Sequence, residues 1–157
     1  MSNESMKKVF VTKLTDTDTT DKEGIGVIRF EGSRVFKYVT YNSGTGGVAA
    51  VANNMTAYHG DNAVVLDSAA DVTSDYTDGT IGAGVLQAAI ANGSYGWIQI
   101  KGVATLGTSL TAGADGNALT IVGAADGTLD VSALVTDYIC AAAVDASADI
   151  VLLDCPW

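Results

Sequence analysis

VLQAAIANGSYGWIQIKGVATL, at residues 85–106, predicts a β-hairpin and is the stretch that decides the class of the fold. The even positions from Ile98 to Leu106 are apolar or small, whereas Gln99, Lys101 and Thr105 occupy odd positions. This alternation is typical of a strand with one buried face. We therefore expect a two-stranded ribbon at the centre of the chain, with one side against the core.

The turn of this hairpin is predicted at Asn92-Gly93-Ser94. Asn-Gly is a strong turn signal because both residues tolerate a positive φ. A two-residue loop would mix polar and apolar residues on both faces, whereas a three-residue loop with a bulge at Gly93 or Ser94 avoids this. The second arrangement predicts the pairs Leu86 with Ile100, Gln87 with Gln99, and Ala88 with Ile98.

Short apolar runs separated by turn residues fill the rest of the chain. We expect strands or strand-like runs at 9–14, 25–31, 34–41, 63–66, 109–110, 118–122, 128–131, 138–144 and 150–153. The run at 34–41 is apolar on both faces, which predicts burial on both sides. Alanines at 141–143 could favour a helix, but glycine is frequent and no long helical stripe is present. Regularly spaced short strands indicate a mainly β fold, a compact β-sandwich or barrel-like domain of short antiparallel strands with little helix.

The charge distribution divides the chain into an arm and a body. Residues 1–41 carry seven basic and six acidic residues, a net charge of +1, whereas residues 42–157 carry Lys101 and twelve Asp, a net charge of −11. We expect an extended N-terminal arm at 1–24, with one strand, and a single β-rich body at 25–157. So acidic a body would repel phosphate backbones, and we expect no nucleic acid as a partner.

The compartment is predicted from the absence of targeting features and from the cysteines. No apolar run follows the N-terminal lysines, and no apolar segment of membrane-spanning length is present, so we expect a soluble chain with no membrane partner. Cys140 and Cys155 fit no zinc spacing. Reduced thiols are the expectation for a chain made in the cytoplasm, and a single Cys140–Cys155 disulfide is the alternative.

Each candidate for chemistry is incomplete. His59 is the only histidine, so a catalytic triad or a histidine-based zinc site would depend on this one residue in a turn. DTDTTD at 16–21 resembles the start of a calcium loop, but Asp21 replaces the glycine at its sixth place and Val27 the glutamate at its twelfth. The glycine-rich runs at 44–47 and 82–84 complete no nucleotide-binding motif. We expect no catalytic residue, no metal site and no cofactor.

The two tryptophans each allow two interpretations. Trp97 is on the odd face of the central strand, and it either packs in the core or anchors a partner. Trp157, the last residue, offers the same choice between closing the core and docking into a neighbour.

Several segments resemble a family of small bacteriophage proteins. They are IGAGVLQ at 81–87, YGWIQIKG at 95–102, FKY at 36–38, GGVAAVA at 46–52 and the final residues 150–157. Together they are similar to the decoration, or cement, proteins encoded beside the major capsid protein in tailed phages. The resemblance covers residues 34–157. Members of this family are β-rich, usually trimeric, and lie on the outside of the expanded shell.

The resemblance implies a virion structural protein that binds the outer capsid surface after synthesis in the bacterial host cytoplasm. The implied partners are the major capsid protein and further copies of the chain in a homotrimer, and no enzymatic activity or cofactor is implied. The arm is not covered, and we hypothesise that it adds a strand to the edge of a shell sheet. The expected partner-binding residues are Val9, Phe10, Val11, Lys13, Leu14, Trp97 and Trp157.

Three alternatives stay open from the sequence. The chain could be another β-rich virion component, either a tail-tube or a head-completion protein. It could be a fibre-associated or receptor-binding domain in which Tyr41, Tyr58 and Tyr76 contact sugar. An enzyme acting on glycans, such as a depolymerase, is a further class.

Overall fold

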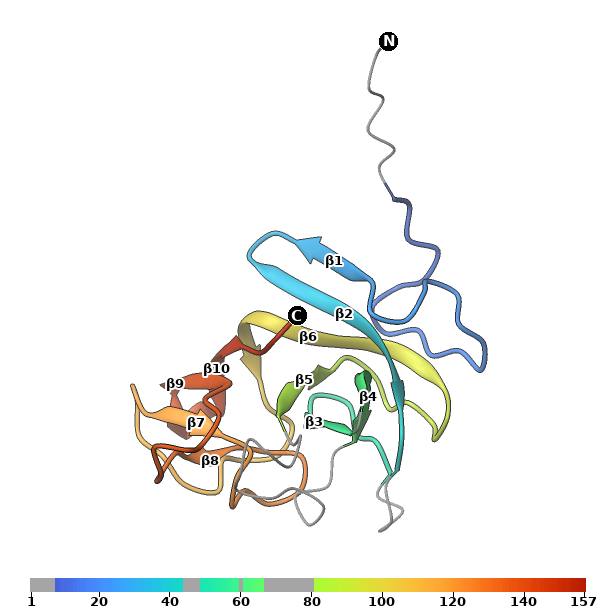
Figure 1. Ribbon diagram of the computed structural model, residues 1–157. Coiled ribbons are helices and arrows are strands. Elements are labelled where there is room, and N and C mark those ends of the chain that lie inside the picture. The colour runs from blue at the N-terminus through green and yellow to red at the C-terminus, as the bar shows by residue number, and fades with distance from the viewer. Residues whose placement is uncertain (1–7, 44–48, 60, 67–80) are drawn as a thin grey trace.

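The computed structural model describes residues 8–43, 49–59, 61–66 and 81–157. These residues form a mainly β fold, as the sequence predicts (Figure 1). The strands are β1 (Ile28–Glu31), β2 (Arg34–Tyr41), β3 (Met55–His59), β4 (Asp61–Leu66), β5 (Gly82–Leu86), β6 (Tyr95–Thr105), β7 (Ala118–Thr120), β8 (Asp130–Val131), β9 (Ala141–Asp145) and β10 (Ile150–Asp154), and a 3-10 helix, η3 (Ala146–Ala148), joins the last two. No helix within the described ranges is long and apolar enough to cross a membrane.

Five of the strands close into a small barrel. Their order is β2-β4-β3-β5-β6, and β6 pairs again with β2. The β2–β4 pair is parallel and the other four pairs are antiparallel. Strand β6 continues beyond the barrel and pairs with β10, from which β9, β7 and β8 extend the sheet. The central stretch of the sequence is therefore also the centre of the topology.

The barrel requires a glycine where β5 approaches β6. A Cβ on Gly84, whose φ is +153°, would lie 2.5 Å from the backbone oxygen of Gln99 on the neighbouring strand. A side chain there would force the two strands apart. The glycine in the GAGVL strand is thus explained by close backbone packing.

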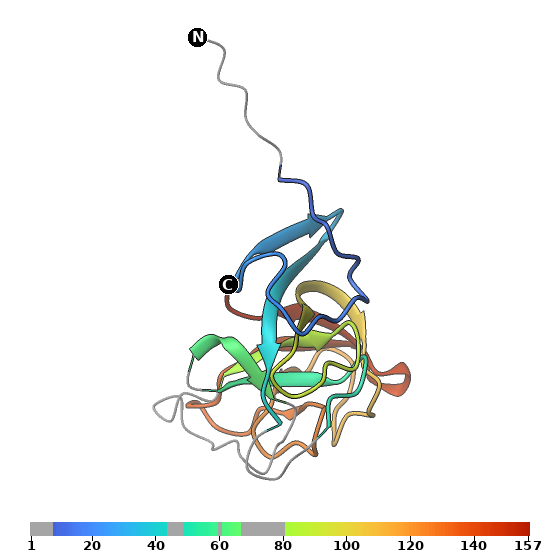
Figure 2. The same ribbon diagram turned by 90° about the vertical axis from the view of Figure 1, so that its right-hand side faces the viewer.

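Strand β2 is buried on both faces, which confirms the prediction for 34–41. Val35 and Val39 point into the barrel core, whereas Phe36 and Tyr38 pack on the other side with Trp97. We call Phe36, Tyr38 and Trp97 the outer cluster. Residues 8–24 cover this cluster, and Figure 2 shows this segment running beside the β1–β2 hairpin.

The central hairpin forms, but its predicted register is wrong. Strand β5 pairs with β6 antiparallel, and Leu86 lies opposite Ile98 instead of Ile100. The Asn92-Gly93 turn is present, with Gly93 at φ +75°, but residues 87–94 lie outside the strands. Ile90 in this connection is buried in the barrel core. Burying Ile90 draws the chain out of the ladder, so the connection is longer than the three-residue loop expected.

The strand predicted at 9–14 is also wrong. Residues 8–14 form no strand, because side chains take the backbone amides that a strand would offer to a neighbour. Glu23 accepts hydrogen bonds from the amides of Val11 and Thr12, and Asp16 accepts one from that of Lys13. Residues 8–16 therefore pack against the body by side-chain contacts, whereas Asp18 forms an isolated antiparallel bridge with Tyr95 at the start of β6. Residues 1–7 of the expected arm lie outside the described residues.

Most of the other strand predictions are confirmed, with bounds that differ by a few residues. β1 begins at Ile28 instead of residue 25 because Gly24 and Gly26 have positive φ. The runs at 118–122 and 128–131 contain β7 and β8, and those at 63–66, 138–144 and 150–153 overlap β4, β9 and β10, whereas 109–110 forms no strand. The alanines at 141–143 belong to strand β9 and not to a helix. Strand β3 was not predicted.

Candidate interaction surfaces

The acidic side chains of the structure cap backbone turns and do not gather into a metal site. Asp21 accepts hydrogen bonds from the amides of Gly24 and Ile25, and Asp18 pairs with Lys22 at 2.9 Å. Among the described residues, no group of three or more His, Cys, Asp or Glu could hold a metal ion. His59 lies at the end of β3, and its side chain is outside the described part.

A buried carboxylate fastens the N-terminal segment to the body. One oxygen of Glu23, Oε1, accepts hydrogen bonds from the amides of Val11 (2.8 Å) and Thr12 (2.7 Å) and from the Thr12 hydroxyl (2.8 Å). The Lys8 ammonium group donates to the Glu23 carbonyl oxygen at 2.6 Å. Hydrogen bonds to an ionised group are stronger than neutral ones. The segment is consequently held in one conformation.

Trp97 is a core residue, so its interpretation as a partner anchor is wrong. Its side chain is completely buried, and its indole Nε1 donates to the Thr12 hydroxyl at 2.9 Å. The Phe10 ring meets it edge-on at 5.5 Å between centroids, and the Arg29 guanidinium lies 5.1 Å and 5.7 Å from the two ring centroids. Phe10 and Leu14 are half-buried against the same outer cluster. The predicted residues Phe10, Leu14 and Trp97 thus lie together, as packing partners of one another.

The other predicted residues of the segment point outward. Val9 is 81 % exposed, and Val11 and Lys13 are also exposed. We call Val9, Val11 and Lys13 the N-terminal surface. Single exposed valines are ordinary, and these two lie two positions apart in the chain and give the segment apolar area that a partner can cover.

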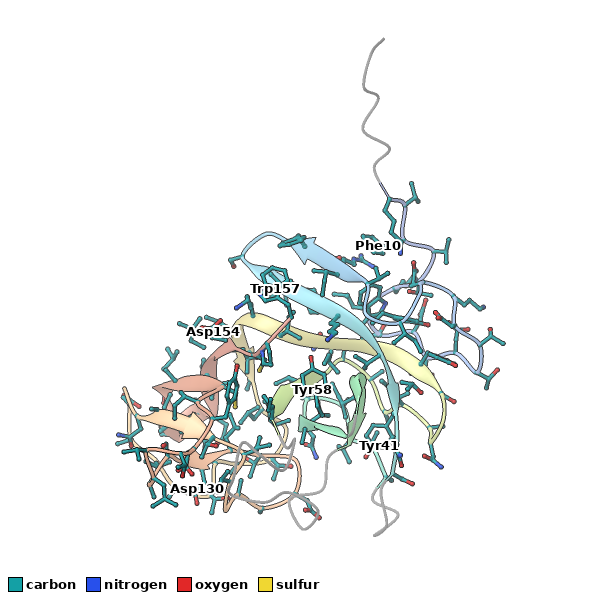
Figure 3. The ribbon with its side chains drawn as sticks, in the orientation of Figure 1. Phe10, Tyr41, Tyr58, Asp130, Asp154 and Trp157 are labelled. Carbon is teal, nitrogen blue, oxygen red and sulfur yellow. The ribbon has the colours of Figure 1, made fainter. Side chains whose placement is uncertain are left out.

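A second exposed apolar area includes Trp157, the last residue, which is labelled in Figure 3. The Trp157 ring is 55 % exposed and lies 5.8 Å from the Phe30 ring, which is 65 % exposed. The Lys101 ammonium group is 5.4 Å from the centroid of Trp157 and forms an ion pair with Asp154. Next along the same strands, the exposed residues Val103 and Leu152 pair across β6 and β10. We call this the aromatic surface, and it consists of Phe30, Lys101, Val103, Leu152 and Trp157.

Sequence reasoning identified only Trp157 and missed the rest of the aromatic surface. Phe30, Val103 and Leu152 are apolar residues on the exposed face of their strands. That signal is visible in the sequence, but their proximity depends on the β6–β10 pairing between residues about 50 positions apart. Such a pairing cannot be read from a local pattern.

Hydrogen bonds fasten the backbone of the two residues that precede Trp157. The amide of Cys155 donates to the Ile100 carbonyl at 3.0 Å, and the Tyr58 hydroxyl donates to the Pro156 carbonyl at 3.4 Å. The Lys37 ammonium group, inside the barrel, donates to the same hydroxyl at 3.1 Å. Burial raises the pKa of Tyr58, so its hydroxyl keeps its proton and remains a donor at neutral pH.

The two thiols are free and buried, as the prediction of reduced cysteines requires. Cys155 donates a weak hydrogen bond to the Cys140 carbonyl at 3.6 Å. The hydrogen bond with the Cys140 thiol, together with burial, raises the pKa of Cys155 well above its ordinary value. A buried, protonated thiol is a poor nucleophile, so this pair packs the core and is not a reactive centre.

A third exposed apolar feature is the loop between β8 and β9. Asp137 Oδ2 accepts hydrogen bonds from the amides of Ala133 (2.9 Å) and Leu134 (2.8 Å), and from the Ser132 hydroxyl (3.2 Å). Leu134 is exposed, and Val135, at 106 % relative exposure, projects fully into solvent. We call Leu134 and Val135 the apolar tip.

Comparison with known proteins identifies no relative. No protein-family model, no curated protein and no solved structure matches this chain. The N-terminal surface, the aromatic surface and the apolar tip are features that suit binding to other proteins. Function is therefore inferred from these surfaces.

Proposed function

We propose that this protein is a non-catalytic virion structural protein that binds the outer surface of an assembled phage capsid and stabilises it. The observation that carries the proposal is a closed β body that displays exposed apolar side chains on hydrogen-bonded, well-fixed segments. The resemblance of residues 34–157 to decoration proteins supports the same conclusion. The implied partners are the major capsid protein and further copies of the chain.

The N-terminal surface is the proposed contact with the shell. Val9 and Val11 supply apolar area, and the lysines near them make this the least acidic part of the chain. Addition of residues 11–13 as a strand to a shell sheet is not supported, because their amides already bond to Glu23 and Asp16. Binding by side chains leaves those bonds intact, and the acidic body faces solvent.

Binding of this kind stabilises a shell by mass action. A protein that binds only the assembled form lowers its free energy by about 2.7 kcal/mol per site when the free concentration is a hundredfold above Kd. A shell repeats its sites many times, so modest contacts add up over the whole particle. Weak surfaces such as two valines are therefore sufficient in this role.

The deciding measurement is the copy number of the chain relative to the major shell protein, by quantitative mass spectrometry of purified particles of the phage that encodes it. We expect a ratio near one per shell subunit or a simple fraction of it. A handful of copies would instead indicate a tail, neck or fibre protein, and absence from the particle would overturn the proposal.

Point substitutions locate the contact. We expect Val9→Asp with Val11→Asp to weaken binding to emptied particles about tenfold or more, since apolar contact is replaced by charge. Val144→Asp is the matched control, because Val144 is also an exposed valine but lies on β9. Equal binding of both variants would exclude the N-terminal surface. Deleting the segment is unsuitable, because Thr12 bonds to the core residue Trp97.

A further inference from the structure

We infer that a polar pocket between β5, β6 and the start of β2 binds a small carboxylic acid that also carries hydroxyl groups, such as a uronic acid. The pocket has a volume of about 310 Å³, which is small for a ligand site and suits a single sugar ring. This site goes beyond the proposed function, because binding of a small acid needs no capsid. The polar side chains that line it are those of Arg34, Asn53, Gln87, Gln99 and Thr105.

A buried glutamine supplies the pocket with a hydrogen-bond acceptor. Gln99 is only 3 % exposed, and its Nε2 group donates to the backbone carbonyls of Lys101 at 3.1 Å and Val103 at 2.9 Å. Both bonds use the same nitrogen, so the orientation of the amide is fixed. The amide oxygen, Oε1, accepts no hydrogen bond from any described residue. It is therefore left as an acceptor for a hydroxyl group of a ligand.

A second glutamine repeats this arrangement. The Nε2 group of Gln87 donates to the Val85 carbonyl at 3.0 Å, which again leaves the amide oxygen as an acceptor. Thr105 lines the same pocket, and its hydroxyl group can both donate and accept. Two amide oxygens favour a ligand with at least two hydrogen-bond donors, which the hydroxyl groups of a sugar ring provide.

Arg34 adds a positive charge to the pocket. Its guanidinium group lies over the Phe36 ring, 5.5 Å from the centroid. Glu31 is opposite Arg34 in the β1–β2 ladder, but its carboxylate pairs with Arg29. Arg34 takes part in none of the ion pairs of the described residues, although the chain has 18 acidic residues. A guanidinium group binds a carboxylate through two parallel hydrogen bonds, so this group favours an acid over a neutral sugar.

A β-bulge brings the arginine and the buried glutamine to the same space. Gln99 pairs with Phe36 and the next pair along β2 is at Val35, so Ile100 is an extra residue in β6. Bulges bend a strand and redirect side chains, often next to functional sites. Because Arg34 lies over Phe36, its guanidinium group and the Gln99 amide border one pocket.

A uronic acid ring matches all three groups. Its carboxylate would bond to Arg34, and two of its hydroxyl groups would donate to the amide oxygens of Gln87 and Gln99. A neutral hexose lacks the first contact, whereas acetate lacks the other two. These three compounds therefore separate the contributions of charge and of hydroxyl groups.

Titration of the isotope-labelled full chain with sodium glucuronate, glucose and sodium acetate, followed by amide chemical shifts, tests the site. We expect glucuronate to bind with a Kd on the order of 1 mM, as a ligand of this size permits. Glucose and acetate should each bind about tenfold more weakly, because each lacks hydrogen bonds that glucuronate makes. No binding of glucuronate, or equal binding of either other compound, would overturn the inference.

Variants assign the contacts. Arg34→Gln should weaken glucuronate binding about tenfold, because hydrogen bonds to a charged group are lost. Gln87→Ala should weaken the binding of glucuronate but not that of acetate. Lys13→Gln is the charge-matched control, since Lys13 is exposed and lies outside the pocket, and it should bind glucuronate like the wild type. Circular dichroism verifies that each variant is folded. Unchanged glucuronate binding by Arg34→Gln would refute the assignment.

A glycan and a free sugar acid are the two sources of such a ligand. A tetrasaccharide in which glucuronate alternates with a neutral sugar distinguishes them. Tighter binding than that of glucuronate would support the site and indicate a glycan, and weaker binding would support it with a free acid as the ligand. None of these results depends on the copy number in the particle, so the proposed function and this inference fail separately.

Discussion

The indole of Trp97 and the hydroxyl of Thr12 form a hydrogen bond of 2.9 Å between residues 85 positions apart in the chain. The same Thr12 hydroxyl donates a hydrogen bond to the Glu23 carboxylate at 2.8 Å, so the three side chains form one network. All three side chains are buried. Thr12 and Glu23 of the expected arm are thus fastened to the buried outer cluster.

Removing the Glu23 carboxylate should loosen the N-terminal segment. Glu23→Ala leaves the amides of Val11 and Thr12 without acceptors, and we expect the free energy of unfolding to fall by about 2–3 kcal/mol. Urea denaturation followed by circular dichroism measures this. Glu23→Gln keeps an acceptor oxygen and should lose less. Unchanged hydrogen exchange at both amides in Glu23→Ala would show that the carboxylate does not hold the segment.

A double-mutant cycle should detect the coupling between Thr12 and Trp97. We expect Thr12→Val and Trp97→Phe to be less than additive, with a coupling energy of about 1 kcal/mol, since either change alone breaks the same hydrogen bond. Thr12→Val combined with Leu119→Ala is the control, because Leu119 belongs to the barrel core and the pair should be additive. Additivity in both pairs would count against the bond.

Gly84→Ala should destabilise the barrel more than a glycine substitution in open space. The new methyl group would lie 2.5 Å from the Gln99 oxygen at φ +153°, and we expect a loss of about 2–4 kcal/mol. Gly116→Ala, at φ +84° with no atom within 4 Å, isolates the backbone strain and should cost about 1 kcal/mol. Thermal denaturation compares the two, and equal losses would mean that β5 and β6 can separate freely.

Stability should fall at alkaline pH. The thiol–thiol hydrogen bond and burial raise the pKa of Cys155 above its ordinary 9.0, and burial raises that of Tyr58 above 10.0. Above these ordinary values the unfolded chain loses protons that the folded chain retains, so the free energy of unfolding decreases as pH rises. Urea midpoints between about pH 8 and about pH 10.5 measure the decline.

Two variants test which groups cause the loss of stability at alkaline pH. Cys155→Ala should reduce the loss of stability that begins near the ordinary thiol pKa. Tyr58→Phe should reduce the loss of stability that begins near the ordinary phenol pKa. A profile identical to the wild type in both variants would mean that other groups govern the alkaline limit, such as Tyr38, whose pKa is also raised by burial.

The fold class follows from local patterns, whereas the pairing of strands does not. The apolar run at 34–41 and the alternation from Ile98 to Leu106 correctly predict two strands, because side-chain direction depends only on the local backbone. The register of the hairpin depends on Ile90, whose burial in the barrel cannot be read from its neighbours in sequence. The predicted strand at 9–14 failed for a similar reason, because Glu23 supplies the acceptors its amides need.

In the candidate sites, too, single residues can be identified from the sequence, but their neighbours in space cannot. Trp157 was identified from its residue type and position, but its partner Phe30 lies 127 positions away and becomes its neighbour only through the fold. For Trp97, the local pattern leads to the wrong expectation about exposure. A tryptophan on the polar side of an alternating strand looks exposed, yet the segment at 8–24 covers it.

Closure of the barrel has a consequence for behaviour at high protein concentration. Each of its five strands has neighbours on both sides, so the described sheet ends only at β1 and β8. β1 carries the charged residues Arg29 and Glu31 within four residues, and β8 is only two residues long. Short or charged terminal strands are poor templates for pairing with another chain. The fold therefore resists edge-to-edge aggregation, and a crowded solution of this chain should stay free of amyloid-like assembly.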